Sequence, residues 1–365
     1  MEKKYIWAIT VIIGASLITV LGISIPIMML TFQCRGMYWP TDYWCTVNPE
    51  DQGLNSSKFE DMYDYIQNNS INLHSVLIVR NNYIVDENFL ENYVRREEKS
   101  FAPHWMVPTE ADHMHQVYSC TKSIVSLLIG IAMEMGYIDN LNQTIYEFFE
   151  DYWSPSYDER KKNITIWHLL TQTSGFPYGG YSIYQSYIQE SLSEPLLFDP
   201  GEGWLYSNTG CFLLSAIINI TTGMKTSEFA RDYLFEPIGI SQKDWSWIED
   251  YQGITNGAYG ICFTPRVMAK IGILCLNNGS WNGNQIVPKE WTIESTSPNP
   301  GSNGDYGYLW WVNPLYYLAA GYSGQWITVI PDYDFIVIFT AEIPDYTYIA
   351  PYDYIIRTFI IGSII

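Results

Sequence analysis

The pentapeptide Tyr118-Ser119-Cys120-Thr121-Lys122 decides how this chain of 365 residues is interpreted. A serine hydroxyl is a poor nucleophile at neutral pH and needs a positioned base. Lys122 lies three residues after Ser119, and a helix places two such side chains on one face. The spacing therefore predicts Ser119 as a nucleophile and Lys122 as its base.

The residues that follow predict such a helix, with Ser119 at its N-terminus. Gly136 is a natural C-terminal stop, and apolar residues recur before it at helical spacing, namely Ile124, Leu127, Leu128, Ile131 and Met135. The positive end of the helix dipole favours a developing alkoxide on Ser119 and disfavours a protonated Lys122. Burial would lower the pKa of Lys122 further, so both effects favour its action as a base.

Two more motifs follow along the chain, Tyr206-Ser207-Asn208 and Gly321-Tyr322-Ser323-Gly324-Gln325. A single Ser-x-x-Lys spacing occurs often by chance. The second motif alone would also fit a surface turn before the apolar helix predicted over residues 212–220, because Ser and Asn commonly cap helices. In this order, however, the three motifs indicate a serine acyl-transfer site.

The ordered motifs resemble the superfamily of serine β-lactamases and penicillin-binding proteins, and within it the class C-related branch of esterases, amide hydrolases and D-aminopeptidases. The resemblance runs from about Leu73 to the C-terminus, and its other carriers are residues 75–80, 164–175, 200–208 and 306–311. It implies an α+β fold of the β-lactamase/transpeptidase-like type, with the site between a sheet part and a helical part. It implies no cofactor.

The resemblance also implies a catalytic set of Ser119, Lys122, Tyr206 and Asn208. Tyr206 would share protons with Lys122 and later protonate the leaving group. Asn208 would hold Lys122 and the acyl amide in place. If the hydroxyl of Tyr206 and the amine of Lys122 lie within hydrogen-bond reach, they titrate as a coupled pair.

The third motif is expected to stabilise the oxyanion of the tetrahedral intermediate. Gly321 and Gly324 would let a strand backbone approach the substrate closely. We therefore expect the backbone N–H groups of Ser119 and Gln325 to form the oxyanion hole.

The same motif supplies the predicted substrate-binding residues Tyr322, Ser323 and Gly324. Relatives often carry Lys or His where this chain has Tyr322. The departure removes a fixed positive charge, which argues against efficient recognition of a substrate carboxylate in β-lactams or D-Ala-D-Ala peptides. Tyrosine also occurs here in esterase-like relatives, so it does not indicate an inactive protein.

Two other groups of polar residues have competing interpretations. His113 and His115 form a His-x-His pair on a short predicted strand, a spacing that zinc can use, yet no further ligands complete a set, and we expect no metal. Four tyrosines after Ser174-Gly175 fit either a lid over the cleft or ordinary packing, and they are Tyr178, Tyr181, Tyr184 and Tyr187.

The N-terminal segment predicts a membrane anchor. Residues 5–32 carry no charge, and at about 1.5 Å per residue the apolar part, residues 6–30, spans a hydrocarbon core of about 30 Å. A cleaved signal peptide is the alternative, but its apolar region usually has only about 7 to 15 residues before a small-residue cleavage site. We expect an uncleaved signal anchor. Lys3 and Lys4 would keep residues 1–4 in the cytoplasm and the large domain outside.

Composition agrees with an exterior domain. The formal net charge is -20, with 19 Lys and Arg against 39 Asp and Glu, which argues against nucleic acid as a partner. Six Asn-x-Ser/Thr sequons permit glycosylation, at Asn55, Asn68, Asn142, Asn163, Asn219 and Asn278. Cys34 and Cys45 could pair in an oxidising compartment, while four cysteines in apolar runs are predicted to be buried thiols, namely Cys120, Cys211, Cys262 and Cys275.

The chain divides into the anchor, a linker over residues 33–54 and one catalytic domain over residues 55–365. Residues 75–80 and 83–88 predict a hairpin joined by Asn81-Asn82. Residues 325–330 and 335–340 predict a second strand pair, and residues 352–360 a closing helix. Helical patterns dominate residues 122–250. We therefore expect an antiparallel sheet built from both chain ends, flanked by helices, with an inserted helical subdomain.

These observations predict a membrane-anchored serine hydrolase that cleaves a small or peptide-like ester or amide through an acyl-enzyme on Ser119. One alternative is a catalytically silent scaffold or binding protein on the same fold. Another is a penicillin-binding D,D-peptidase. The motifs define neither the natural substrate nor the oligomeric state.

Overall fold

The computed structural model describes residues 38–90, 114–302, 304–342 and 349–365. The chain forms two compact units, Met1–Pro40 and Thr41–Ile365, and every helix and strand named below lies in the second. Of the helices in the described ranges, none has the length and apolar character needed to cross a membrane. The span predicted over residues 5–32 lies outside those ranges.

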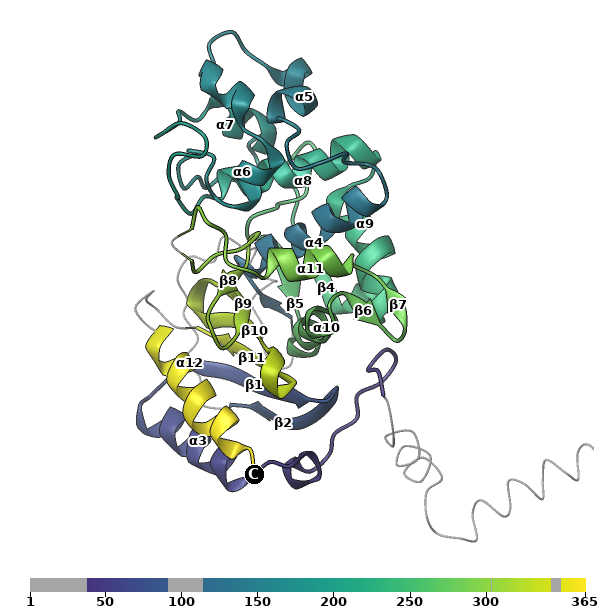
Figure 1. Cartoon of the computed structure of the whole chain (residues 1–365), viewed down its shortest axis with the longest axis vertical. Coiled ribbons are helices and arrows are strands. Elements are labelled where there is room, and N and C mark those ends of the chain that lie inside the picture. Colours follow the sequence, from purple (N-terminus) through teal and green to yellow (C-terminus); the bar gives the residue numbers. More distant parts are fainter. Residues whose placement is uncertain (1–37, 91–113, 303, 343–348) are drawn as a thin grey trace, which may run out of the picture. The chain divides into compact units, whose positions relative to one another are not determined.

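The central feature is a six-stranded sheet whose strands come from both ends of the domain (Figure 1). Its order is β2-β1-β11-β10-β9-β8 and its paired strands are all antiparallel. This confirms the predicted sheet. The strands are β1 (Leu73–Arg80), β2 (Tyr83–Phe89), β8 (Trp311–Val312), β9 (Tyr317–Gly321), β10 (Gln325–Ile330) and β11 (Phe335–Ala341).

Both predicted hairpins are present. Asn81 and Asn82 join β1 to β2 with φ angles of 50° and 69°, as a two-residue hairpin turn requires, and asparagine tolerates this left-handed conformation. Asp334, with φ of 55°, closes the turn between β10 and β11. Turn chemistry therefore sets the register of both pairs.

Two terminal helices, α3 (Ser57–Asn68) and α12 (Ile349–Ile355), cover one face of the sheet. Helix α12 continues as the π-helical turn η10 (Ile356–Ile360). Figure 1 shows α3 and α12 side by side on this face. Their apolar side chains form a core with alternate strand residues, such as Val337 and Phe339. Tyr352 stacks on Phe339 with ring centroids 4.5 Å apart. The predicted closing helix is confirmed.

The opposite face of the sheet carries α10 (Pro265–Leu276) and α4 (Cys120–Glu134). Successive strand residues point to opposite faces, so the neighbours of Val337 pack here, and Gly272 of α10 lies against Ile336 and Ile327. Every residue of α4 from Cys120 to Ala132 is buried. A helix that is buried on all sides forms the centre of the domain, and it starts at the predicted nucleophile.

A mostly helical subdomain is inserted between β2 and β8, as predicted. Its central helix is α8, which packs against α4 and the four shorter helices. The helices are α5 (Ile145–Phe149), α6 (Ile166–Leu170), α7 (Tyr187–Ser193), α8 (Thr209–Thr222) and α9 (Thr226–Ala230). The remaining elements are β3 (His115–Gln116), β4 (Trp245–Trp247) and β5 (Ile261–Phe263), which form a small sheet, then β6 (Ser280–Trp281), β7 (Asn284–Gln285) and α11 (Lys289–Ser295).

The second compact unit begins before the predicted domain boundary at residue 55. Thr46 pairs with Ile84 and the buried Leu54 pairs with Ile364, so the residues before 55 pack on the sheet part. Cys45 is buried and disulfide-bonded, whereas Cys34, its predicted partner, lies outside the described residues. The other four cysteines are free and buried, as predicted.

Candidate active site

Ser119 occupies the N-cap of α4 and is partly exposed. The residue before it, Tyr118, has φ of 45°, a conformation that is uncommon for a bulky side chain. The chain therefore turns sharply into α4 and presents the hydroxyl of Ser119 at the first turn of the helix. Backbone strain of this kind persists only where the surrounding structure holds it.

Lys122 lies directly below Ser119 and is only 1% exposed. Its Nζ donates to Ser119 Oγ at 3.1 Å, to Asn208 Oδ1 at 2.7 Å and to the Ala258 carbonyl at 2.8 Å. These three acceptors use all the protons of an ammonium group. Sequence reasoning predicted the first two contacts and missed Ala258.

The surroundings of Lys122 adjust its proton affinity. Burial lowers the pKa of Lys122 to about 8, and the nearby thiols of Cys211 and Cys120 oppose this shift. Burial also raises the pKa of both thiols, which therefore stay neutral and add little charge. A substantial fraction of Lys122 is thus neutral near pH 8, as a general base requires.

Tyr206 lies beside this lysine. The Nζ of Lys122 sits over the Tyr206 ring, 4.9 Å from the centroid, so the two interact through the ring face. Burial raises the pKa of Tyr206 well above its ordinary value, and a hydrogen bond with the Ser119 side chain partly offsets that rise. The phenol therefore remains protonated and can act as a proton donor.

An aromatic cluster fixes the ring of Tyr206. Trp311 stacks on it at 5.9 Å between centroids, and Tyr306 meets it edge-on at 6.3 Å. Tyr178 lies 6.4 Å away at the rim, where its side chain is 55% exposed. Trp204 contacts both Tyr306 and Trp311. The surroundings of the Tyr206 ring are thus largely aromatic.

Asn208 connects the lysine to the helical subdomain. Its Oδ1 accepts from Lys122, while its Nδ2 donates to the Gly179 carbonyl at 2.9 Å. Its backbone N–H donates to the Tyr178 carbonyl at 2.7 Å. With both ends of the amide bound, Asn208 has a fixed orientation and presents oxygen to the lysine.

Gln172 is a second residue that sequence reasoning missed at this site. It is buried with φ of 61°, and its carbonyl accepts from the Leu205 N–H at 3.0 Å. Its side-chain Oε1 accepts from the N–H of Ser207, the residue between Tyr206 and Asn208. Gln172 therefore binds the backbone on both sides of Tyr206, at Leu205 and at Ser207. The signal for it was only its place in the motif at residues 164–175.

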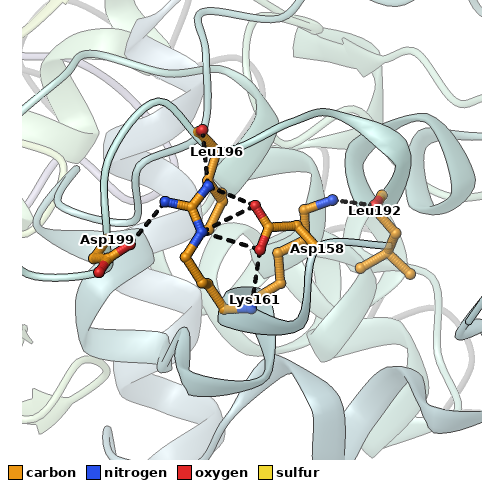
Figure 2. A network of polar contacts seen from close by, with 6 residues as sticks. Asp158, Lys161, Leu192, Leu196 and Asp199 are labelled. Atoms are coloured by element: carbon orange, nitrogen blue, oxygen red, sulfur yellow. Dashed lines mark hydrogen bonds and ion pairs between the residues drawn. The ribbon is translucent and has the colours of Figure 1, made fainter. Parts of the chain in front are cut away.

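The loop that leads to Tyr206 is anchored by a network of charges (Figure 2). Arg160 forms ion pairs with Asp158 at 2.6 Å and with Asp199 at 2.7 Å, and it donates to the Leu196 carbonyl. The buried Lys161 donates to the Leu192 carbonyl at 2.6 Å. The network fixes the loop at Leu196 and Asp199, and Gln172 fixes it further along at Leu205 and Ser207.

The third motif forms a turn rather than a continuous strand. Gly321 ends β9, and a Cβ there would lie 2.1 Å from the Val117 carbonyl, so only glycine permits this approach to the start of α4. Tyr322, Ser323 and Gly324 form the 3-10 turn η8, in which Ser323 has φ of 62°.

The two ends of this turn have different surroundings. Tyr322 is 38% exposed, and its ring meets that of Tyr118 edge-on at 5.5 Å, one residue from the nucleophile. Gln325 opens the inner strand β10 opposite Gly321, and its side-chain amide is directed to Ala341. The roles of Ser119 and Gln325 as oxyanion donors stay predictions.

Of the four tyrosines that fit either a lid or ordinary packing, two are packed in the interior and two are exposed. Tyr187 is buried, and the hydroxyl of Tyr181 bonds to Glu194 and Thr209, so both pack inside the helical subdomain. Tyr178 lies at the rim of the site, and Tyr184 is 83% exposed.

Of the His-x-His pair, the structure describes only His115. His115 is buried on β3, with its Nδ1 3.4 Å from the Nδ1 of His74, and His113 lies outside the described residues. Among the described residues, no group of three or more His, Cys, Asp or Glu side chains could hold a metal ion.

The chain belongs to the beta-lactamase family, whose model matches residues 92–347. This confirms the superfamily of serine β-lactamases and penicillin-binding proteins, and with it a hydrolase in the general sense. The structure of FmtA from Staphylococcus aureus superposes with a TM-score of 0.65 at 16% identity, covering 85% of this chain and 91% of that one. At that identity it shows the fold alone.

Two relatives match in sequence over shorter regions. Penicillin-binding protein 4* of Bacillus subtilis is 31% identical over 148 residues, which are 37% of this chain and 31% of that protein. Esterase EstB of Burkholderia gladioli is 28% identical over 153 residues, which are 36% of this chain and 38% of that protein. The chain therefore spans less than two-fifths of the length of either relative.

Proposed function

We propose that this protein hydrolyses an ester or an amide through an acyl-enzyme on Ser119. The observation that carries the proposal is a single contact. The Nζ of Lys122, buried and with a pKa lowered to about 8, bonds to Ser119 Oγ at 3.1 Å. No ordinary surface lysine has that combination of burial, lowered pKa and a serine partner.

The proposed reaction begins when neutral Lys122 accepts the hydroxyl proton of Ser119 and Ser119 Oγ attacks the substrate carbonyl carbon. The bond to the leaving group then breaks, and the proton passes to that group through Lys122 and Tyr206. A water molecule then attacks the acyl carbon while Lys122 accepts one of its protons. The bond between the acyl carbon and Ser119 Oγ breaks, Ser119 Oγ takes that proton, and the acid leaves.

The substrate class follows from charge and shape. Tyr322 offers a neutral hydroxyl where relatives often carry a cation. Trp311 and Tyr306 surround the ring of Tyr206, which lies beside the nucleophile. Both features favour a neutral ester with an apolar acyl group over a β-lactam or D-peptide with a free carboxylate. The similarity to the esterase from Burkholderia gladioli agrees with this choice.

We further propose that the domain works outside the cell, tethered by a signal anchor over residues 5–32. The charge-free segment and the preceding Lys3 and Lys4 support the anchor. The disulfide at Cys45 supports an oxidising compartment. The large negative charge supports solubility there.

Covalent labelling tests the proposed reaction. A fluorophosphonate probe should label the wild-type chain and not Ser119→Ala, and a panel of esters, amides, β-lactams and D-peptides should then rank the substrates. Undiminished labelling of Ser119→Ala would reject this nucleophile. If the probe does not label the wild type, a catalytically silent scaffold is favoured. If penicillin labels the protein stably, a D,D-peptidase is favoured.

A further inference from the structure

Among the residues that the structure describes, the Ala258 carbonyl is the one backbone acceptor of Lys122. It lies 2.8 Å from Nζ, as close as the Asn208 amide oxygen at 2.7 Å and closer than Ser119 Oγ at 3.1 Å. A backbone carbonyl has no side chain to aim it, so another group must hold the peptide in place.

Asn256 provides that hold. Its Oδ1 accepts from the N–H groups of Ala258 at 3.1 Å and Tyr259 at 2.9 Å, so one amide oxygen binds both peptides that follow Gly257. Asn256 has no exposed surface. Its own backbone is tied at both ends, since its N–H donates to Ile248 and its carbonyl accepts from Trp247 Nε1.

The turn between Asn256 and Ala258 is pressed against α8. A Cβ at Gly257 would lie 2.0 Å from the Cys211 carbonyl, so only glycine fits between the turn and the helix. The thiol of Cys211 also interacts electrostatically with Lys122. The contact with α8 therefore fixes the turn at Gly257, and the hydrogen bonds of Asn256 set the orientation of the peptide that carries the Ala258 carbonyl.

Tyr187 fixes which way the amide of Asn256 points. Its hydroxyl accepts from Asn256 Nδ2 at 3.0 Å, which leaves the amide oxygen for the two backbone N–H groups. The ring of Tyr187 stacks on Phe212 at 4.6 Å, and its backbone N–H donates to Asp250 at 2.9 Å. A chain of fixed contacts thus runs from Tyr187 through Asn256 and Ala258 to Lys122.

We propose that Asn256 is a positioning residue for acyl transfer, which holds the Ala258 carbonyl against Lys122 and thereby sets how readily that lysine exchanges its proton. The inference rests on the proposed function, because it concerns the base of that reaction. It adds a residue outside the three motifs that adjusts the proton affinity of Lys122.

The sign of the effect follows from the dipole of the carbonyl. A carbonyl oxygen that accepts from the ammonium stabilises the charged lysine, so losing it lowers the pKa of Lys122 below about 8. The titratable groups that face Lys122 are Cys120 and Cys211, whose pKa values burial raises, and Tyr206, whose pKa is also raised. All three are neutral at working pH.

The experiment compares two changes of the same residue in the full chain. Asn256→Ala frees the turn and should lower kcat/KM at its optimum about tenfold. It should also move the acid limb of the pH profile to lower pH by at least about half a unit. Asn256→Asp keeps both acceptor bonds to the backbone, so its acid limb should stay at the wild-type position or move to higher pH.

Thr255→Val is the matched control. Thr255 is buried next to Asn256, and its hydroxyl accepts from the Ser227 N–H at 3.3 Å, not from the two peptides that Asn256 holds. It should lower stability without moving the acid limb. Tyr187→Phe, which releases only the Nδ2 end of the amide, should shift the limb in the same direction as Asn256→Ala and by less. It also replaces Asn256→Ala if that variant does not fold.

Two results would overturn the proposal. One is that the acid limb of Asn256→Ala coincides with that of Thr255→Val. If Asn256→Ala does not fold, the same comparison is made with Tyr187→Phe. The other is an Asn256→Asp limb that falls as far as that of Asn256→Ala. An NMR titration of Lys122 with labelled lysine reads the same shift without substrate. If the titration shows the shift but the wild type transfers no acyl group, the proposed function fails and the positioning role stands.

Discussion

Lys122 Nζ lies closer to Asn208 Oδ1, at 2.7 Å, than to Ser119 Oγ, at 3.1 Å. The base is therefore held more tightly by the residue that orients it than by the residue it activates. When Ser119 becomes acylated and its hydroxyl proton has left, Asn208 and Ala258 still bind the lysine. In the proposed reaction, the amine therefore stays in place to activate water in the second step.

Lys122→Ala and Tyr206→Phe should each reduce kcat/KM for a neutral ester at least about a hundredfold, because both move the same protons. The double variant should lose little more than the worse single variant, since residues that act as a unit are not additive. Steady-state kinetics of the four proteins measure this. Effects that multiply would mean that the two side chains act independently.

Activity should depend on the neutral form of Lys122. Its pKa is lowered to about 8, so the neutral fraction rises about tenfold per unit as the pH rises from 6 towards 8 and levels off above that value. The logarithm of kcat/KM should follow this rise with a slope near one. A profile that is flat between pH 6 and 8 would contradict the role of Lys122 as the base.

Gln172→Leu should cost about 1–3 kcal/mol of stability, because the Ser207 N–H loses its buried acceptor. It should also reduce kcat/KM, since the segment that carries Tyr206 and Asn208 is released. Denaturant unfolding and ester kinetics measure both effects.

Ser75→Ala is the matched control for this prediction. It removes another buried hydrogen bond, between Ser75 Oγ and Thr340 Oγ1 at 2.6 Å in the sheet. It should lower stability comparably and leave kcat/KM nearly unchanged. Equal losses of activity in Gln172→Leu and Ser75→Ala would show that Gln172 acts only through stability.

Tyr322→Lys should improve turnover of a carboxylate-bearing β-lactam relative to a short neutral ester. A charge-assisted hydrogen bond contributes roughly 1.5 to 3 kcal/mol, or about ten- to a hundredfold in affinity. Tyr322→Met, which is neutral, controls for the loss of the ring contact with Tyr118. Wild-type turnover of the β-lactam that already equals that of the ester would refute the argument from charge.

The topology prediction concerns residues 1–35. In intact cells, external protease should reach the domain after Arg35, and a tag placed before Lys3 should stay protected. The measurement is a protease-accessibility blot. A processed, soluble protein in the medium would show instead that the segment is a cleaved signal.

The two hairpins and the Ser119–Lys122 pair were predictable because their signals are local. Asn81-Asn82 marks its hairpin through backbone conformation, and the Ser119–Lys122 spacing needs only one helical turn. Asn208 was predictable through the resemblance, since its motif has a fixed place in the order along the chain.

The residues that were missed act through the backbone or through distant contacts. The Ala258 carbonyl bonds to Lys122, yet any residue type could supply it, so the sequence carries no sign of it. Gln172 binds the Ser207 N–H, which only the folded chain brings near. Asn256 binds N–H groups in its own turn, but nothing in the sequence links that turn to Lys122. Tyr187 and Tyr184 look alike in sequence, and long-range packing alone makes one buried and the other exposed.

The pairing of β1 with β11 has a consequence for how the protein is made. Leu73 pairs with Ala341 and Arg80 with Phe335. Strand β1 therefore cannot form this pairing until β11, one of the last segments to be synthesised, is present. Contacts this distant along the chain form slowly, and the apolar faces of β1 and α4 stay unprotected until β10 and β11 arrive. A nascent chain therefore has no formed site. The packing of the start of α4 against the sheet is therefore completed only when synthesis of the chain is nearly finished.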